Sequence, residues 1–256
     1  MKSLRFSYIS RALMLIFILS PLWIYGQETT VMVRVHSKDA KFIGSSIGGA
    51  KIIVKDDATG KILAEGITKG STGDTEKIMQ EPRKRGERLT DENTAGFLAR
   101  LEISEPVLVT VEAIAPVNKR QAAVRSSTQL WVIPGKNIEG DGVVIEVPGF
   151  VVDILSPQTH ERIPQEEEVQ ITANVVMMCG CPVTPDGIWD ANNYEVAAMV
   201  KGETGDPVIV RLEPLQKEST FAGTISLESG NYEVTVYAFD PATGNTGLDK
   251  TNIIIN

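Results

Sequence analysis

The stretch GNYEVTVYAFD, residues 230–240, decides the fold of this chain. Tyr232, Val234, Val236 and Ala238 occupy every second position, so a β-strand would place all four on one face, toward a core. Valine, threonine and tyrosine also favour extended structure. A glycine opens the stretch and the turn-forming sequence PATGNT follows it, so the predicted strand is bounded at both ends.

Similar short runs fill the rest of the chain after residue 26. They are rich in Val, Ile and Thr, and Gly, Pro, Asn and Asp separate them, as in strands joined by turns. Seven lie in each half, a number typical of a small β-sandwich. The expected strands are residues 30–35, 50–54, 61–67, 97–103, 107–114, 129–133, 143–147, 151–155, 169–178, 194–200, 208–212, 221–227, 232–239 and 252–255. Pro148-Gly149 separates the two series, so we expect an all-β fold with two β-sandwich domains in tandem, residues 27–148 and 149–256.

The second half resembles bacterial Ig-like and fibronectin-type sandwich domains. Residues 230–240 follow their G-x-Y-x-V-x-V-x-A-x-D strand, and DPATGNT, residues 240–246, is similar to the D-x-x-G-N loop before their last strand. The sequence ILSP, residues 154–157, resembles their opening. The resemblance covers residues 150–256 and implies an Ig-like fold. It says little about function, because this sandwich carries many binding roles.

The first half resembles transthyretin-like and carboxypeptidase-regulatory-like domains. The segments GGAKIIVKD, residues 48–56, and TGKILAEGIT, residues 59–68, match their strand, Thr-Gly hairpin and second strand. The chain departs from the pattern with a long polar insert, residues 70–95, in which residues 76–80 could form one helical turn ended by Pro82.

The insert concentrates positive charge. Its basic residues include Arg83, Lys84, Arg85 and Arg88. A loop this long in a compact domain is usually functional or disordered. Two interpretations follow: a solvated, disordered segment, or a basic docking arm that binds an acidic partner.

The N-terminus predicts export. Lys2, Arg5 and Arg11 form a basic segment, an apolar run follows at residues 12–25, and Gly26 precedes polar Gln27. This is the arrangement of a secretory signal peptide, residues 1–26. The apolar run is shorter than the roughly 20 residues of a spanning helix. We expect a mature protein that begins near Gln27, is not inserted in a membrane and is periplasmic or extracellular.

The charge balance excludes some partners. The whole chain has 25 basic and 33 acidic residues, and residues 1–26 hold three of the basic ones and no acidic one, so the mature part carries a net charge of −11. A protein this acidic lacks the positive surface that nucleic acids and anionic membranes require. We expect protein partners and no nucleic acid.

Met177, Met178, Cys179 and Cys181 form the one local cluster that could carry chemistry, in the sequence MMCGCP, residues 177–182. In a continuing strand both cysteines would lie on the face of Met177, with Met178 on the other. Three interpretations remain open: a structural pair, buried or disulfide-bonded, a soft-metal site for copper(I) that uses thiolate and thioether ligands, or a redox or intermolecular disulfide pair.

Catalytic patterns are scarce. The sequence GSSIG, residues 44–48, matches G-x-S-x-G, but a strand follows it where a hydrolase needs a helix, so we expect a turn. The two histidines, His36 and His160, are expected on the surface, and His160 is expected at the opposite pole of its domain from the cysteines. We therefore expect no enzyme.

Acidic and amide side chains follow the cysteines in one loop, and an Ig-like topology brings residues 240–249 alongside. Their oxygens suit either turns and strand edges or calcium. They are Asp186, Asp190, Asn192 and Asn193.

Three functions are compatible with these features. The first is a non-enzymatic binding or assembly subunit of an exported complex. The alternative is a copper carrier or chaperone that uses the Met-Met-Cys-Gly-Cys cluster. A polysaccharide-binding module would need aromatic platforms, for which only Trp189 and Tyr194 lie near the loop pole.

Overall fold

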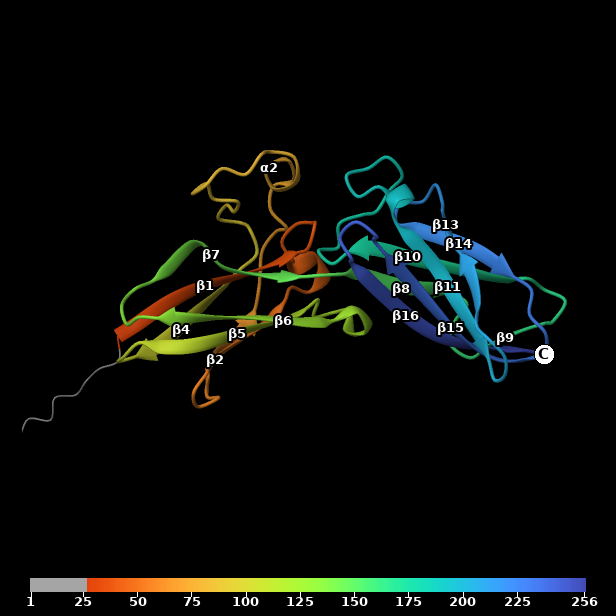
Figure 1. Cartoon of the computed structure of the whole chain (residues 1–256), viewed down its shortest axis with the longest axis horizontal. Coiled ribbons are helices and arrows are strands. Elements are labelled where there is room, and N and C mark those ends of the chain that lie inside the picture. Colours follow the sequence, from red (N-terminus) through yellow and green to blue (C-terminus); the bar gives the residue numbers. More distant parts are fainter. Residues whose placement is uncertain (1–26) are drawn as a thin grey trace, which may run out of the picture.

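The computed structural model describes residues 27–256, whose regular secondary structure is almost entirely β-strand (Figure 1). The predicted signal peptide lies outside the described residues. Two sandwiches follow one another along the long axis of the molecule, with the first half of the chain in one and the second half in the other. No helix within residues 27–256 is long and apolar enough to cross a membrane.

The first sandwich has one sheet of three strands and one of four. The smaller sheet has the order β4-β1-β7, and central β1 is antiparallel to β4 and parallel to β7. The larger sheet has the order β3-β2-β5-β6. The strands are β1 (Gln27–Ser37), β2 (Lys51–Asp56), β3 (Ile62–Ile67), β4 (Phe97–Ile103), β5 (Val107–Ala115), β6 (Val124–Val132) and β7 (Ile138–Val147). Three short helices join them: η2 (Ser45–Ile47), α2 (Thr75–Met79) and η3 (Arg120–Ala122).

The second sandwich has the strand arrangement of an Ig-like domain. One sheet has the order β13-β14-β10-β8, and the other has the order β12-β11-β15-β16-β9, with β9 parallel to β16. The chain thus places its first, second and fifth long strands in one sheet and the others opposite, as Ig-like sandwiches do. The elements are β8 (Phe150–Ser156), β9 (Glu161–Ile163), β10 (Val169–Met177), η4 (Ala191–Asn193), β11 (Glu195–Gly202), β12 (Val208–Arg211), β13 (Glu213–Pro214), β14 (Thr220–Ile225), β15 (Gly230–Phe239) and β16 (Thr246–Ile255).

The strands form where alternation predicted them. Val234, Val236 and Ala238 of β15 are buried and Tyr232 is half-buried against the core, as expected. Each predicted strand overlaps an observed one, and η2 confirms the turn predicted at residues 44–48. The predicted helical turn is α2, which ends before Pro82.

The largest errors are strand starts. β16 begins at Thr246 and β6 at Val124, several residues before the predicted apolar runs. Those extra residues are mostly polar, and backbone pairing with β15 and β5 extends the strands without an apolar signal. Short β9 and β13 were not predicted for the same reason.

The two sandwiches meet through a hydrogen-bonded joint. Asn245, which is fully buried, accepts a bond from the backbone N–H of Gly149 (2.9 Å) and donates one to the carbonyl of Lys38 (3.1 Å). The Lys38 ammonium in turn donates to the carbonyl oxygen of Thr243 (2.6 Å). The loop that resembles D-x-x-G-N therefore fixes one sandwich against the other.

Candidate functional site

The cysteine cluster forms a tight turn at the end of β10. Cys179 and Cys181 are joined in a disulfide across Gly180, whose φ of 78° allows the turn. The backbone N–H of Met177 donates to the carbonyl of Cys181 (3.0 Å), and that of Gly180 donates to the carbonyl of Met177 (2.7 Å). A disulfide is one form of the structural pair expected from the sequence. A bonded pair offers no thiolate, so the predicted copper site would require reduction first.

The four sulfur atoms divide between two cores. Cys179, Cys181 and Met177 are buried in the core of the second sandwich, whereas Met178 is buried in the core of the first. Met177 and the two cysteines therefore lie on one face and Met178 on the other, as predicted. The face that carries Met178 is buried too, against the first sandwich. Within residues 27–256 no group of three or more His, Cys, Asp or Glu side chains could hold a metal ion. The copper site stays a prediction.

The loop pole of the second sandwich is not an open surface. Trp189 and Tyr194 are both buried, and the Trp189 indole N–H donates to the carbonyl of Asp39 in the first sandwich (2.8 Å). Burial, together with the negative charges of Asp240, Asp39 and Asp190, raises the pKa of Tyr194 to about 12. The expectation that these rings offer sugar-binding platforms is wrong, because they pack into the core and against the other sandwich.

The acidic side chains of this loop form turns. The carboxylate of Asp190 accepts bonds from the backbone N–H groups of Asp186 (3.0 Å) and Asn192 (3.0 Å) and from the Asn192 amide (2.9 Å). These bonds lower the pKa of Asp190. They match the turn chemistry expected from the sequence.

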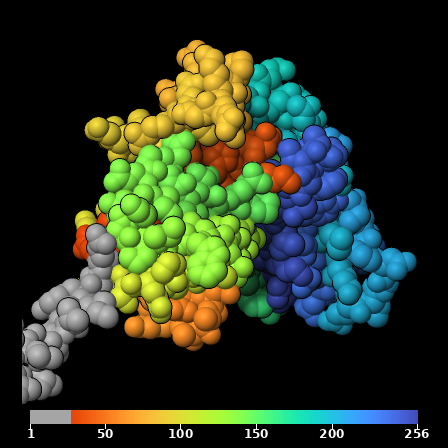
Figure 2. Space-filling view, turned by 60° about the vertical axis from the view of Figure 1, so that its left-hand side comes forward, coloured from red at the N-terminus to blue at the C-terminus, as the bar shows by residue number. Residues whose placement is uncertain are grey.

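The basic residues of the insert lie together on an exposed loop, residues 81–88, which we call the basic loop. Every residue of it is exposed, including Arg83, Lys84, Arg85 and Arg88. The surrounding segment stands out from the first sandwich in the space-filling view (Figure 2). The ion pairs found within residues 27–256 involve other side chains. Arg88 lies near enough to Asp141 for its charge to help lower the pKa of that carboxyl.

The first half of the insert is held by the chain around η2. The backbone N–H of Ser45 donates to the carbonyl of Gly70 (2.9 Å), and the N–H of Phe42 donates to the carbonyl of Thr72 (3.1 Å). Asp74 then caps α2 by accepting from the backbone N–H of Lys77 (2.9 Å), and Ile78 is buried. The loop therefore starts from a fixed helix.

The second half is held by two charged side chains. Asp141 of β7 accepts from the backbone N–H of Leu89 (2.9 Å) and from both the N–H (3.1 Å) and hydroxyl (2.6 Å) of Thr90. Burial acts to raise the pKa of Asp141, but these hydrogen bonds outweigh it and the pKa lies below its usual value. Buried Arg34 of β1 donates to the carbonyls of Thr94 and Ala95.

His36 lies in the same covered region, and its predicted place on the surface is wrong. It is 9% exposed and packs edge-to-face against Phe42, with ring centroids 5.0 Å apart. Burial, with a smaller contribution from the charge of Arg83, lowers the pKa of His36 to about 4. The prediction rested on the place of His36 at the end of the first strand, but Phe42, which follows in the chain, bridges to His36 and packs against its ring.

Sequence reasoning missed the anchors Arg34 and Asp141, and it missed the burial of His36. A signal for two of them existed in VMVRVH, residues 31–36, where Arg34 and His36 alternate with core valines. An arginine and a histidine on the face of β1 that points away from the core indicate that polar groups cover that face. The insert supplies those groups.

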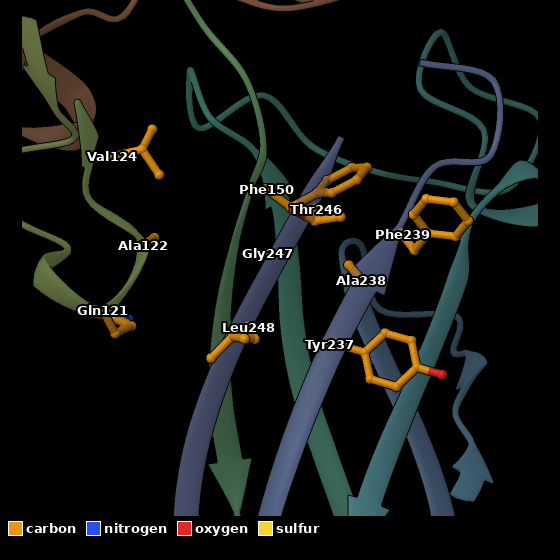
Figure 3. A pocket seen from close by; sticks show the side chains of 10 residues that line it. All are labelled: Gln121, Ala122, Val124, Phe150, Tyr237, Ala238, Phe239, Thr246, Gly247 and Leu248. Carbon is orange, nitrogen blue, oxygen red and sulfur yellow. The ribbon is translucent and has the colours of Figure 1, made fainter. Parts of the chain in front are cut away.

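One groove lies between η3 and the β15–β16 pair, with a volume of about 460 Å³ (Figure 3). Its walls include Val124, Phe150, Phe239 and Leu248, and none of the residues that line it is charged. The Tyr237 hydroxyl at its edge donates to Glu195 (2.6 Å), which raises the pKa of Tyr237 to about 12. The groove thus holds no acid–base pair.

No family model and no curated protein sequence matches the chain. Among solved structures, an engineered protein is similar with a TM-score of 0.31 and 21% identity over 46% of this chain and 22% of its own length. The fibronectin(III)-like modules of Clostridium thermocellum CbhA align with a TM-score of 0.30 and 11% identity over 90% of this chain and 94% of theirs. The titin domains Z1Z2 in complex with telethonin align with a TM-score of 0.26 and 10% identity over 90% and 95%.

Proposed function

We propose that this protein is an exported, non-enzymatic binding subunit of a periplasmic or extracellular complex, and that it docks an acidic protein partner through the basic loop. The observation that carries the proposal is the presentation of Arg83, Lys84, Arg85 and Arg88 on an exposed loop that is anchored at both ends. The supporting arguments are electrostatic and entropic.

The electrostatic argument rests on the difference in charge between the basic loop and the rest of the protein. The mature chain carries a net charge of −11, whereas residues 81–88 hold four basic residues against Glu81 and Glu87, a net charge of +2. The basic loop is therefore a positive segment on an acidic protein. The Debye length at physiological ionic strength is about 8 Å, so four cations within one short loop act together at contact distance. An acidic partner would therefore be steered to one orientation.

The entropic argument rests on the anchors. A free arm loses backbone freedom on binding, and that loss reduces affinity. Here α2 fixes one end of the basic loop and Asp141 fixes the other, with Arg34 behind it. Only residues 81–88 remain to be ordered by a partner, so more of the contact energy appears as affinity.

The test compares two variants of equal charge. Reversal of Arg83, Lys84, Arg85 and Arg88 to Glu should abolish binding of a poly-glutamate peptide and should slow association with the natural partner more than it speeds dissociation. The control reverses the charge of four exposed lysines outside the basic loop: Lys61, Lys136, Lys201 and Lys217. It changes the net charge by the same amount and should retain binding.

The natural partner can be sought with the same pair. Exported proteins of the native host are captured on wild type and on both variants, and the partner is defined as a protein lost only with the loop variant. Its binding to wild type should weaken steeply between about 0.01 and 1 M salt, as screening shortens the reach of the charges. Equal capture by wild type and the loop variant would contradict the proposal.

Three structural assignments accompany the function. We propose that residues 1–26 are a cleaved signal peptide and that residues 27–148 and 149–256 are separate domains. The parallel pairing of β1 with β7, opposite the sheet β3-β2-β5-β6, supports a transthyretin-like first domain. N-terminal sequencing of the exported protein should begin near Gln27, and an intact residue 1 on membrane-bound protein would contradict export with cleavage.

A further inference from the structure

Consecutive basic residues occur at two places within residues 27–256. One is Arg83-Lys84-Arg85, followed by Gly86, and the other is Lys119-Arg120. Endoproteases that recognise basic residues need an extended, accessible segment, which exposed loop tips supply and folded elements do not. The two places can therefore be compared directly.

The basic loop is accessible, and only one backbone hydrogen bond closed within it has to break before the segment can extend. All residues from Glu81 to Arg88 are exposed, and the one backbone hydrogen bond closed within the loop runs from the N–H of Glu87 to the carbonyl of Lys84 (3.2 Å). Gly86 has a φ of 80°, and a side chain added there would meet no atom within 4 Å. There is therefore open space beside Gly86.

The second basic pair, Lys119-Arg120, lies in a folded and bonded segment. Arg120 begins η3, and Lys119 closes that turn by accepting from the backbone N–H of Ala122 (3.1 Å). The Lys119 ammonium is also bonded to the carboxylate of Asp153 at 2.7 Å, across the joint between the sandwiches. A protease could bind this pair only after the joint had opened locally.

We propose that the basic loop is a cleavage site for an endoprotease that recognises consecutive basic residues, and that the cleaved protein stays assembled as two chains. Hydrolysis adds one water across a peptide bond, such as Arg85–Gly86, and breaks its C–N bond. Arg85 then ends in a carboxylate and Gly86 begins with an ammonium group. The inference goes beyond the proposed docking function and does not depend on it.

The strand order explains why the pieces would stay together. The cut leaves β1, β2 and β3 on the first piece, and every later strand on the second. β1 lies between β4 and β7 and is paired with both, and β2 is paired with β5. Cleavage therefore severs no sheet, and the two pieces share the core of the first sandwich.

Side-chain contacts also cross the cut. Arg34 on the first piece holds the carbonyls of Thr94 and Ala95 on the second. The carbonyl of Asp39 accepts from Trp189, and Lys38 donates to Thr243. Separation of the pieces would break these buried and partly buried contacts in addition to the strand pairing.

The test uses the full chain and a protease specific for paired basic residues, under native conditions and at limiting enzyme. Mass analysis should find the first cut within residues 83–86 and none at Lys119-Arg120 while the protein remains folded. The two pieces should co-elute in size-exclusion chromatography and separate only in denaturant. The variant R83Q/K84Q/R85Q should resist cleavage, and K119Q/R120Q should be cut as fast as wild type.

Two results would overturn the proposal. A first cut at Lys119-Arg120, or equal rates at both places, would show that exposure of the basic loop does not select the site. Separation of the pieces in native buffer would show that the cut destroys the fold. Neither result bears on poly-glutamate binding by the uncut chain, so failure here is distinguishable from failure of the proposed function.

Discussion

The indole N–H of Trp189 donates a 2.8 Å hydrogen bond to the carbonyl oxygen of Asp39, a residue 150 positions earlier in the chain. The bond joins the long loop of the second sandwich to the turn after β1 in the first. Trp189 is buried, whereas Asp39 is exposed, so the bond lies at the edge of the joint and is partly buried. A tryptophan that could have been a binding platform is instead part of the joint.

Replacement of Trp189 with Phe should destabilise the protein. The change removes the donor of this partly buried bond, and a hydrogen bond of this kind contributes about 1 kcal/mol net to stability. Chemical denaturation should show a lower unfolding free energy. The control W131F alters a ring that is 64% exposed and should change the unfolding free energy little. Equal effects of the two variants would contradict a role for Trp189 in the joint.

Met178 should be a second determinant of the joint. It is 1% exposed and extends from the second sandwich into the core of the first. M178A should lower the unfolding free energy by about 2–5 kcal/mol, as for other buried methionines. The control M199A alters a partly exposed methionine on β11 and should cost about 0.5 kcal/mol or less. A similar loss in both variants would contradict a coupling role for Met178.

The disulfide makes a clear prediction about copper. Non-reduced protein should take up no Cu(I), because the sulfurs of Cys179 and Cys181 are bonded to one another. If the copper hypothesis holds, reduced protein should bind about one ion per chain or per shared pair, because thiolates and thioethers suit Cu(I). C179S/C181S should then bind none, and substitution of Met177 or Met178 should weaken uptake. A titration of reduced protein without a saturable site would end the hypothesis.

Alternation predicted most of the fold. Each sheet of a sandwich buries one face, so every second residue of a strand is apolar. This alternation, as in residues 230–240, identifies the strands and the face that points to the core. Strands such as β9 were missed because backbone hydrogen bonds to a neighbouring strand form them, and such bonds do not depend on residue type.

The candidate sites were harder to predict because their surroundings come from distant parts of the chain. The positions of Arg83, Lys84, Arg85 and Arg88 in a polar insert were readable, but their anchor Asp141 lies far along the sequence. Trp189 was predicted in an exposed loop of the second sandwich, but the first sandwich covers that loop and accepts its hydrogen bond. Contacts between the two sandwiches follow no local pattern.

His36 predicts how stability depends on pH. Its pKa is lowered to about 4 in the folded protein, mainly by burial and further by the charge of Arg83, whereas an unfolded chain has an ordinary value near 6.5. The unfolded state therefore binds the proton first as pH falls. The contribution of neutral His36 is fully present above about pH 6.5 and is lost as pH falls toward about 4.

The size of the loss follows from the shift. Each pKa unit corresponds to about 1.4 kcal/mol, so unfolding free energy should fall by about 3 kcal/mol across this window. H36F should flatten that slope, since it keeps an aromatic ring beside Phe42 and cannot be protonated. R83Q should raise the pKa of His36, measured by NMR, because it removes the nearby positive charge. Asp141 has a lowered pKa, so its contribution is present above the ordinary carboxyl pKa of 3.8 and is lost as pH falls from there toward the lower folded value. A D141N variant should therefore leave the slope between about pH 4 and 6.5 nearly unchanged. An equal slope in wild type and H36F would show that His36 is not the group that titrates.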